Sequence, residues 1–199
     1  MSLDLDDLDP DPLTQLSAWL ADAEATGVTL PQAFALATAD GEGRPSVRFV
    51  LLRGLDADGL RYYTNRASRK GRDVAANPWA SAAFWWPALE RQARIAGPVR
   101  QLPDEASEAY WATRPRGSQL SAAASDQGRE VGSRTELEAR VAELAARHPE
   151  SVPRPAVWGG YLLIPHAVEF WAGRPDRLHD RVEYRRGADG SWHRRRLQP

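Results

Sequence analysis

Two basic stretches of the sequence have residue types and a spacing that suit a phosphate group. The first is Arg48–Arg53, an apolar run with an arginine at each end. Residues five apart in a strand point to opposite faces, so these two arginines cannot both lie on one solvated face. The second leads from Tyr63 and Thr64 to Arg69 and Lys70, where a predicted strand passes into a helix. Free N–H groups at a helix start, with adjacent cations, can cradle a phosphate.

Three further stretches carry groups that can recognise an anion or a ring. Arg114–Ser118 places two guanidiniums and a hydroxyl in a rigid turn, with Tyr110 one helical turn earlier. The segment 177–181 holds a histidine between arginines, close to Trp171. Gln92, between two predicted strands, can both donate and accept hydrogen bonds. Taken singly, these stretches and the two above are also compatible with solvated arginines or loops, a structural histidine and a polar sheet edge.

Other reaction chemistries lack the residues that they need. The sequence of 199 residues has no cysteine, which excludes a disulfide framework, a thiolate zinc site and thiol catalysis. It contains no Gly-x-Ser-x-Gly, His-Glu-x-x-His or phosphate-loop motif. Its four histidines are scattered without ligand spacing, so no metal is expected.

The net charge of the sequence is ordinary, but the choice of basic residue is not. The net charge is −1, yet every basic residue except Lys70 is an arginine. A guanidinium fork matches phosphate and carboxylate oxygens, although genomic base composition explains the excess equally well. The aromatic residues are mostly tryptophans in apolar runs rather than an exposed stacking series, which argues against a nucleic-acid partner.

Hydrophobic periodicity and turn residues predict the elements that position these groups. Helices are predicted over 12–26, 68–77, 103–113 and 133–148. Asp11 is expected to cap the first helix, and the segment 114–118 is expected to end the helix that begins at 103. Strands are predicted in hairpin order at 34–38, 46–53, 60–64, 80–86, 92–101, 159–164, 167–171, 181–185 and 192–197. Turns at 40–43 and 56–59 predict that the first three strands form an antiparallel meander.

This order predicts an α+β fold that is mainly β, because strands outnumber helices and do not alternate with them. A closed or nearly closed antiparallel barrel with peripheral helices fits best. Residues 11–199 are expected to form one domain after an acidic, flexible N-terminus at 1–10. No apolar run approaches the roughly 20 residues of a membrane span, so no membrane partner is expected. The acidic N-terminus lacks the parts of a secretion signal, so a cytoplasmic location is expected.

In this order and spacing, the five stretches resemble the pyridoxine (pyridoxamine) 5'-phosphate oxidase family. The resemblance covers nearly the whole chain, from about Asp11 to Pro199. It is carried by Arg48–Arg53, Tyr63–Asn65 with Arg69-Lys70, Leu89–Gln92, Arg114–Gln119, and Glu169–Trp171 with Arg177–Arg181. The resemblance implies an FMN-binding split β-barrel, with FMN held at the interface of a homodimer.

The resemblance also implies a role for each matching residue. The implied FMN contacts are Arg48, Phe49, Val50, Leu51, Leu52, Arg53, Tyr63, Thr64, Arg69, Lys70, Gln92, Gln127, Trp171 and Arg181. A phosphorylated pyridine substrate would meet Arg53, Tyr110, Arg114, Ser118, Arg177 and His179. Of these, Arg177 and His179 would be the catalytic residues.

The sequence departs from the family pattern in three places. Arg53 stands where the family usually has lysine, which replaces a point donor by a fork. Gly128 follows Gln127 where a hydroxyl residue is common, which removes one phosphate contact. The sequence also begins almost directly at its first helix, so the basic, tyrosine-bearing N-terminal arm of some members is not expected.

The activity implied by the resemblance is oxidation of pyridoxamine 5'-phosphate, pyridoxine 5'-phosphate or both to pyridoxal 5'-phosphate. Dioxygen would be reduced to hydrogen peroxide, while Arg177 covers the pyridine ring and His179 bonds near its 3-hydroxyl. Two other activities stay open. A related group of FMN oxidases acts on phenazine precursors, but it tends to lose the Arg-Pro-Arg-x-Ser motif found at 114–118. A split barrel can also carry flavin, deazaflavin or pyridoxal phosphate without turnover, which would leave Arg177 and His179 without a purpose.

Overall fold

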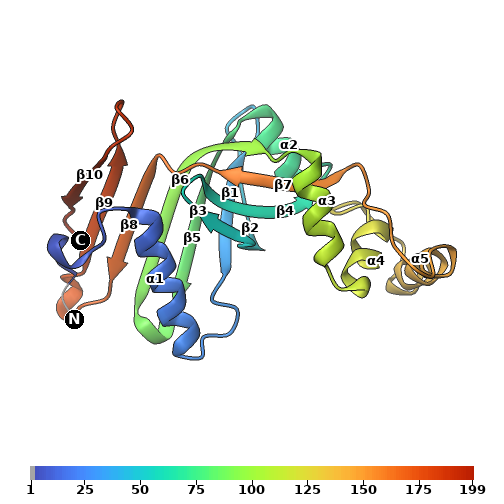
Figure 1. Cartoon of the computed structure of the whole chain (residues 1–199), viewed down its shortest axis with the longest axis horizontal. Coiled ribbons are helices and arrows are strands. Elements are labelled where there is room, and N and C mark those ends of the chain that lie inside the picture. Colours follow the sequence, from blue (N-terminus) through green and yellow to red (C-terminus); the bar gives the residue numbers. More distant parts are fainter. Residues whose placement is uncertain (1–2) are drawn as a thin grey trace.

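The framework of the protein is one curled antiparallel sheet, seen in a computed structural model that describes residues 3–199. Within this range the sheet has ten strands: β1 (Ala33–Ala39), β2 (Pro45–Leu51), β3 (Gly54–Asp56), β4 (Gly59–Asn65), β5 (Trp79–Trp86), β6 (Arg91–Gln101), β7 (Trp158–Leu163), β8 (Ala167–Ala172), β9 (Asp180–Arg186) and β10 (Trp192–Arg196). Neighbours follow the order β10-β9-β8-β6-β5-β1-β2, and β3, β4 and β7 form a branch that joins at β6. The predicted mainly β, α+β fold is confirmed (Figure 1).

The helices lie at the periphery of this sheet. They are α1 (Pro12–Ala25), α2 (Arg69–Ala76), α3 (Asp104–Thr113), α4 (Arg116–Ala124) and α5 (Arg134–Arg147). Asp11 caps α1 as predicted, because its carboxylate accepts from the N–H groups of Leu13 and Thr14. Figure 1 shows α1 beside β6 and β8, and α3, α4 and α5 at the opposite end of the molecule. None of the helices within residues 3–199 has the length and apolar character needed to cross a membrane.

Strand β6 belongs to both parts of the sheet and bends between them. Its residues 91–96 pair with β8, and its residues 99–101 pair with β7. Gly97 lies at the crossing, where a Cβ atom would come within 1.9 Å of the carbonyl oxygen of Ile164. Only glycine allows the two backbones to approach so closely. The bend therefore separates the β3–β4–β7 branch from the β8–β9–β10 part of the sheet.

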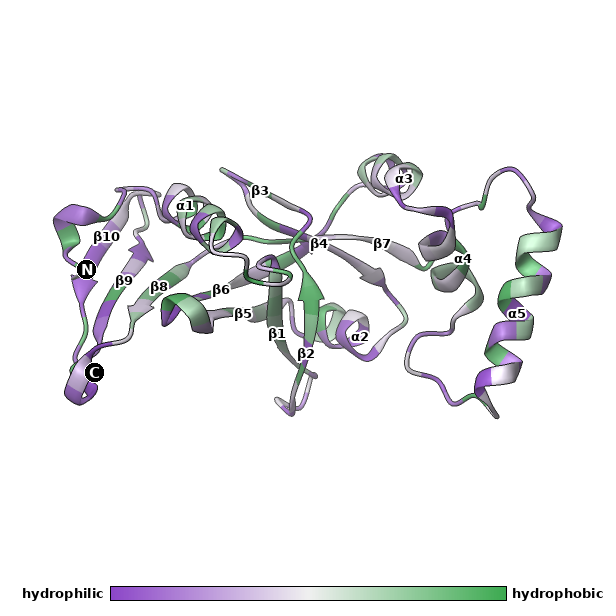
Figure 2. Cartoon of the chain, turned by 90° about the horizontal axis from the view of Figure 1, so that it is seen from below, coloured by the Kyte–Doolittle hydropathy of each residue, from purple (hydrophilic) through white to green (hydrophobic). Residues whose placement is uncertain are grey.

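Two hydrophobic clusters hold these parts together. In the larger one, Trp19 of α1 meets Trp86 and Phe170 edge to face, with ring centroids 6.2 and 4.8 Å away. The indole N–H of Trp86 donates to the Pro31 carbonyl at 2.9 Å, so this buried polar group is satisfied. The smaller cluster lies under α3, α4 and α5 and is built on Trp111, Leu120, Val152 and Trp158. Figure 2 shows green and purple residues alternating along α5, one side of which packs on this cluster.

Residues 3–10 lie against the last two strands. Leu3 and Leu8 are buried in the larger cluster. Arg194 of β10 donates to the carbonyl groups of Leu5 and Leu8 at 2.8 and 3.0 Å. The predicted flexibility of the first ten residues concerns motion and stays a prediction; Met1 and Ser2 lie outside the described residues. The single domain predicted over 11–199 also stays a prediction.

Two local predictions were wrong. The segment 114–118 was predicted as a rigid turn that breaks the helix. The break is present, because α3 ends at Thr113, but the turn is wrong, because residues 116–118 already form the first turn of α4. A proline without an N–H group fits a helix start as well as it breaks a helix. The predicted meander is also wrong, because the β1–β2 hairpin pairs with β5 whereas the β3–β4 hairpin pairs with β7. The chain turns away after Leu51, and the N–H of Arg53 donates to the Arg61 carbonyl.

Candidate functional site

Most of the predicted phosphate-binding residues meet where β2, β4 and α2 come together. A cavity of about 450 Å³ is lined by Arg48, Phe49, Val50, Leu51, Arg53, Tyr63, Thr64, Lys70, Tyr110, Arg114, Gln127 and Trp158. All of these except Trp158 were predicted as site residues. A second cavity of about 440 Å³ shares Tyr63, Thr64, Arg114, Gln127 and Trp158 with the first and adds Ser118. The residues predicted for the FMN phosphate and for the substrate phosphate therefore lie side by side.

Arg48 is held by a buried network behind the first cavity. Its Nη1 donates to Thr38 Oγ1 at 2.7 Å and to the Leu36 carbonyl at 3.1 Å. Its Nη2 lies 3.7 Å from Asp73 Oδ2, which also accepts from Thr38 Oγ1 at 2.6 Å. Burial lowers the pKa of Arg48, and the charge of Asp73 opposes that shift. Asp73 is only 4% exposed, so it acts as a fixed countercharge that orients the guanidinium.

Lys70 lies buried beside Arg48 on the first turn of α2. Its Nζ donates to Thr64 Oγ1, Ser68 Oγ and Gln127 Oε1 at 3.3, 3.2 and 3.2 Å, and all three acceptors are neutral. Burial, followed by the charge of Arg48, lowers the pKa of Lys70 to about 8. A bound anion would stabilise the protonated ammonium group, so this environment favours a phosphate.

Stacked aromatic rings form a wall common to both cavities. The rings of Tyr63 and Tyr110 are 3.9 Å apart, and Trp158 lies 5.6 Å from Tyr63 on a nearly parallel plane. The guanidinium of Arg114 lies 4.8 Å from the centroid of the Trp158 ring. Burial lowers the pKa of Arg114, and the charge of Arg53 acts in the same direction. Within the described part of the chain, Arg114 Nη1 is buried without a hydrogen-bond partner, which is the expected state of an anion donor without its anion.

A second group of predicted residues lies on the other part of the sheet. Gln92 of β6, Trp171 of β8 and Arg181 of β9 are direct neighbours in one row across three strands. Arg181 donates to both carboxylate oxygens of Glu169, at 2.9 and 3.1 Å. This bidentate pair raises the pKa of Arg181 and fixes its guanidinium beside Trp171. None of the three predicted residues lines the first cavity.

The two predicted catalytic residues lie on the loop between β8 and β9. The ring of His179 is 4.6 Å from that of Trp171. The N–H of Arg174 donates to His179 Nδ1 at 3.1 Å, so in the neutral ring the proton resides on Nε2. Arg177 has a φ of +62°, in the left-handed region. Figure 1 places this loop at the β8–β9 end of the molecule, away from α3 and α4.

Two predicted residues lie outside both groups. Leu52 is buried in the larger hydrophobic cluster, and Arg69 is the exposed first residue of α2. The charge of Arg69 still contributes to the lowered pKa of Arg48, although burial is the larger cause. Their FMN contacts stay predictions.

Sequence reasoning missed Trp158, Thr38 and Asp73. Trp158 begins β7 and comes beside Asn65 through the pairing of β7 with β4. Thr38 and Asp73 are 35 positions apart and meet only because α2 packs on β1. The sequence carried one weak signal, which is an acidic residue in the middle of the basic segment 69–76.

Comparison with known proteins assigns the family. Residues 20–148 match the family model described as pyridoxamine 5'-phosphate oxidase. Residues 158–199 match the model of the pyridoxine 5'-phosphate oxidase C-terminal dimerisation region. The chain belongs to the pyridoxamine 5'-phosphate oxidase family. The predicted family is therefore confirmed, and this family member is an oxidoreductase.

Relatives match over almost the whole length of this pyridoxamine 5'-phosphate oxidase family member. The pyridoxine/pyridoxamine 5'-phosphate oxidase of Cupriavidus pinatubonensis is 50% identical over 198 residues, covering 100% of this chain and 93% of the relative. The protein of the same name from Synechocystis is 49% identical over 189 residues, covering 94% and 88%.

Two solved structures share the fold across their full lengths. PhzG from Burkholderia lata, in complex with tetrahydrophenazine-1-carboxylic acid, is 37% identical with a TM-score of 0.93, and both chains are covered completely. A pyridoxamine 5'-phosphate oxidase-related, FMN binding protein from Nostoc punctiforme is 21% identical with a TM-score of 0.77, again over both whole chains. The predicted split-barrel class is confirmed by these neighbours.

Proposed function

We propose that this protein is an FMN-dependent oxidase that converts pyridoxamine 5'-phosphate, pyridoxine 5'-phosphate or both into pyridoxal 5'-phosphate in the cytoplasm. The observation that carries the proposal is the first cavity, where cations suited to two phosphate groups surround one aromatic-walled space. Relatives named pyridoxine/pyridoxamine 5'-phosphate oxidase at 50% identity support the substrate class.

The residues around Lys70 fit the phosphate of FMN. Lys70 and Arg48 are close enough for the charge of Arg48 to lower the pKa of Lys70, and Lys70 donates to neutral oxygens alone. Both cations lie beside the first turn of α2, whose free N–H groups favour an anion. Thr64 and Gln127 supply further polar atoms on the wall of the cavity. These four side chains would hold the phosphate, since together they offer donors to several of its oxygens.

The residues around Arg114 fit the phosphate of the substrate. Arg53, Tyr110 and Arg114 line the first cavity, and Ser118 lines the second cavity, which adjoins it. The buried, unbonded Nη1 of Arg114 is the donor that a substrate oxygen would satisfy. Stacking on Trp158 keeps the guanidinium plane in place, so little entropy is lost on binding.

The second group of residues completes the site in a homodimer. Gln92, Trp171 and Arg181 lie on the side of the sheet that also exposes large apolar side chains; Phe49 is 78% exposed and Trp85 is 51% exposed. Exposed apolar surface of this kind marks an interface. The match of residues 158–199 to a dimerisation region supports the same arrangement. The first group is the set of predicted residues that line the two cavities around Lys70 and Arg114. In this dimer, the first group of one copy and the second group of the other would face the same FMN.

The protein's part in the reaction is to bind, orient and shield the reactants. A bound FMN supplies hydride acceptance from the substrate C4' carbon and transfer of the electron pair to dioxygen, which leaves as hydrogen peroxide. Arg177 would cover the pyridine ring and hold C4' in place, and ordering of this kind removes several kcal/mol from a barrier. His179 would donate from Nε2 to the ring's 3-oxygen, because its Nδ1 is occupied by the Arg174 N–H.

A second candidate function is oxidation of a phenazine precursor. It is favoured by the TM-score of 0.93 to PhzG, a protein that binds tetrahydrophenazine-1-carboxylic acid. A phenazine carboxylic acid carries a carboxylate in place of a phosphate, so it would offer fewer anionic oxygens to the donors of Arg53, Arg114 and Ser118. The placement of Arg114 and Ser118 on adjoining cavities therefore favours the phosphorylated pyridine.

One assay separates these functions. The purified protein is incubated with FMN and each of three substrates: pyridoxamine 5'-phosphate, pyridoxine 5'-phosphate and a reduced phenazine carboxylic acid. Pyridoxal 5'-phosphate absorbance and peroxide are followed. Aldehyde and peroxide in equal amounts support the proposal. Peroxide with the phenazine alone supports the second candidate, and FMN binding without turnover indicates a carrier.

A further inference from the structure

Asp180 connects the loop that carries Arg177 and His179 to the N-terminal segment and to β10. Its Oδ2 accepts from Arg174 Nε at 2.6 Å and from the N–H of Leu3 at 3.1 Å, and its Oδ1 accepts from Arg196 Nη1 at 2.7 Å. The side chain is 14% exposed. Burial alone would raise the pKa of Asp180, but the hydrogen bonds from these partners lower it overall, so the carboxylate is charged at neutral pH.

The loop between β8 and β9 has a strained backbone at two residues. Asp176 and Arg177 have φ values of +56° and +62°, a region that side chains other than glycine rarely adopt. Such a conformation persists only when the surrounding structure determines it. Within the tip, the N–H of Leu178 donates to the Pro175 carbonyl at 3.2 Å, but the Leu178 side chain is 72% exposed and packs little against the protein. The side-chain hydrogen bonds that support the loop lie at its base.

The base of the loop is held by Arg174 and Asp180. The guanidinium of Arg174 bonds to the Asp180 carboxylate, and the backbone N–H of the same arginine donates to His179 Nδ1 at 3.1 Å. One residue thus connects the carboxylate to the histidine ring. If Arg174 moved, His179 would lose the bond that selects its Nε2–H form.

The N-terminal segment holds Asp180 from the other side. Arg196 of β10 donates to the Leu3 carbonyl at 2.8 Å as well as to Asp180, and the buried Leu3 side chain anchors this end of the chain in the larger cluster. The N–H of Leu3 then completes the set of donors around the carboxylate. Residues 3 and 196, at the two ends of the sequence, therefore meet at the carboxylate beside the loop.

We propose that Asp180 is a positioning residue for Arg177 and His179, and that it couples the N-terminal segment to their loop. The inference rests on the proposed function for the roles of Arg177 and His179, whereas the coupling itself is a property of the chain. The carboxylate holds Arg174, Arg174 holds the His179 ring, and Leu3 and Arg196 keep the carboxylate in place.

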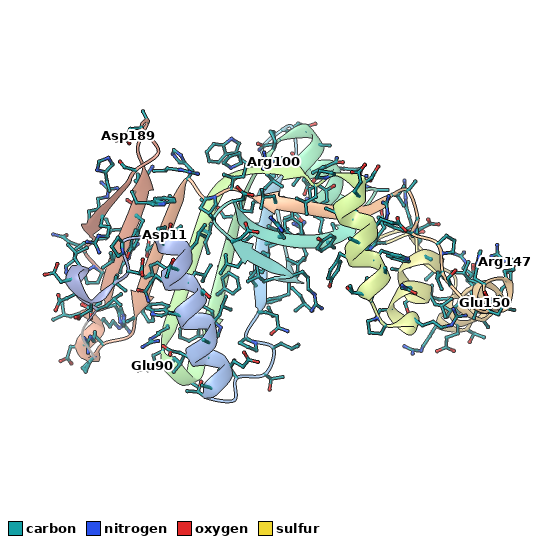
Figure 3. The ribbon with its side chains drawn as sticks, viewed as in Figure 1. Asp11, Glu90, Arg100, Arg147, Glu150 and Asp189 are labelled. Carbon is teal, nitrogen blue, oxygen red and sulfur yellow. The ribbon has the colours of Figure 1, made fainter. Side chains whose placement is uncertain are left out.

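The test compares Asp180→Asn with a matched control, Asp189→Asn, in the full chain. Both aspartates belong to the β9–β10 hairpin, but Asp189 lies in the turn at its far end and bonds to Ser191 (Figure 3). The first readout is amide hydrogen exchange over residues 173–179 in the FMN-free protein, followed by mass spectrometry. Asp180→Asn should speed exchange there about tenfold or more, because a bond to a charged group is lost. Asp189→Asn should leave that segment unchanged.

The second readout is steady-state kinetics with FMN at saturation. Misplacement of Arg177 and His179 should lower kcat by about ten- to a hundredfold in Asp180→Asn. The dissociation constant of FMN should stay within about twofold, because the first group of residues is untouched. Arg174→Ala should reproduce the kinetic change, and the double variant should add little to either single variant, since both changes break one connection.

Unchanged exchange over 173–179 in both Asp180→Asn and Arg174→Ala would overturn the coupling. Faster exchange with unchanged kcat in an active enzyme would overturn the positioning role. If the wild-type protein turns over no phosphorylated pyridine, the proposed function fails, while the exchange experiment still decides the coupling. If Asp180→Asn does not fold, Arg174→Ala carries the same test, because its backbone N–H remains and only the ion pair is lost.

Discussion

FMN binding should weaken above neutral pH because of a single group, Lys70. The lysine is buried beside Arg48, and this environment lowers its pKa to about 8. A phosphate monoester has its second pKa near 6, so the ligand keeps its charge from pH 7 to pH 9 while Lys70 loses its proton. The protonated ammonium group is the form that attracts the phosphate, and the deprotonated amine is not.

The size of the effect follows from that pKa. With a pKa of about 8, roughly nine-tenths of Lys70 is protonated at pH 7 and roughly one-tenth at pH 9. If only the protonated form binds, the dissociation constant of FMN rises about tenfold between these values, which is about 1.4 kcal/mol. Arg48 and Arg114 remain charged throughout, so they add no slope of their own.

The assay is a titration of the protein with FMN at pH 7, 8 and 9, followed by quenching of flavin fluorescence. Two variants serve as controls. Lys70→Gln should bind FMN more weakly at pH 7 and show no slope, because the titrating group is gone. Lys70→Arg should also show no slope but keep tighter binding, because its charge persists at every pH.

Titration of Lys70 does not produce this slope by weakening the fold. The pKa of Lys70 lies below its ordinary value of 10.5 in the folded chain, so between about pH 8 and 10.5 the unfolded chain binds more protons at this residue. Below about pH 8, burying the protonated Lys70 lowers the free energy of unfolding by its full amount. As the pH rises from about 8 to 10.5, Lys70 of the folded chain is neutral and this destabilisation disappears. Lys70 therefore makes the FMN-free protein more stable at pH 9 than at pH 7. A flat wild-type titration, or a slope that survives in Lys70→Gln, would refute the assignment of Lys70 to the phosphate.

Three further changes test other parts of the site. Asp73→Asn removes the buried countercharge of Arg48 and should lower the free energy of unfolding by about 3 kcal/mol, measured in urea, with weaker FMN binding by the same fluorescence titration. Arg114→Lys loses the fork stacked on Trp158 and should raise the KM of the phosphorylated substrate about tenfold with FMN affinity unchanged; an unchanged KM would place the substrate phosphate elsewhere. Val47→Asp puts a charge at an apolar position that is 68% exposed on β2 and should shift the dimer toward monomers in analytical ultracentrifugation without a change in circular dichroism.

The framework could be predicted from the sequence wherever the signal is local. The cap Asp11, the proline after it and the apolar positions up to Trp19 define α1 within a few neighbouring residues. The hairpin turns have the same local character, and the turn at 40–43 correctly predicted the β1–β2 pairing. The turn at 56–59 is also present, but it joins β4 to the short strand β3, which was not predicted, and not to the strand predicted over 46–53. Pro115 shows the limit of local reading, since the same residue ends one helix and starts the next, and the sequence pattern alone showed only the break.

The remainder of the site depends on pairings between distant segments. Trp158 joins the aromatic wall only because β7 adds to β4, across almost a hundred residues of chain. Asp73 reaches Thr38 only because α2 packs on β1, and no periodicity encodes that contact. The branch of the sheet at β6 could not be predicted either. It depends on the close approach of two backbones at Gly97, and one glycine in a strand sequence does not indicate such a contact. Resemblance to a family supplied the list of cations, whereas the residues that orient those cations had to come from the structure.

The predicted FMN residues lie on two different parts of the sheet, so the proposed site would connect FMN binding to dimer formation. Lys70 and Arg48 lie on the α2 side, whereas Trp171 and Arg181 lie on the β8–β9 side beyond the bend in β6. In the proposed site, a single chain would therefore offer FMN either the cations around Lys70 or the ring contacts around Trp171. If FMN binds across the proposed interface, it binds the dimer more tightly than it binds either chain alone. Linkage then requires FMN to raise the affinity between the two chains by the same factor by which dimer formation raises the affinity for FMN. In that case bound FMN would favour the pairing of two chains, and exposed apolar residues such as Phe49 would become buried in the dimer.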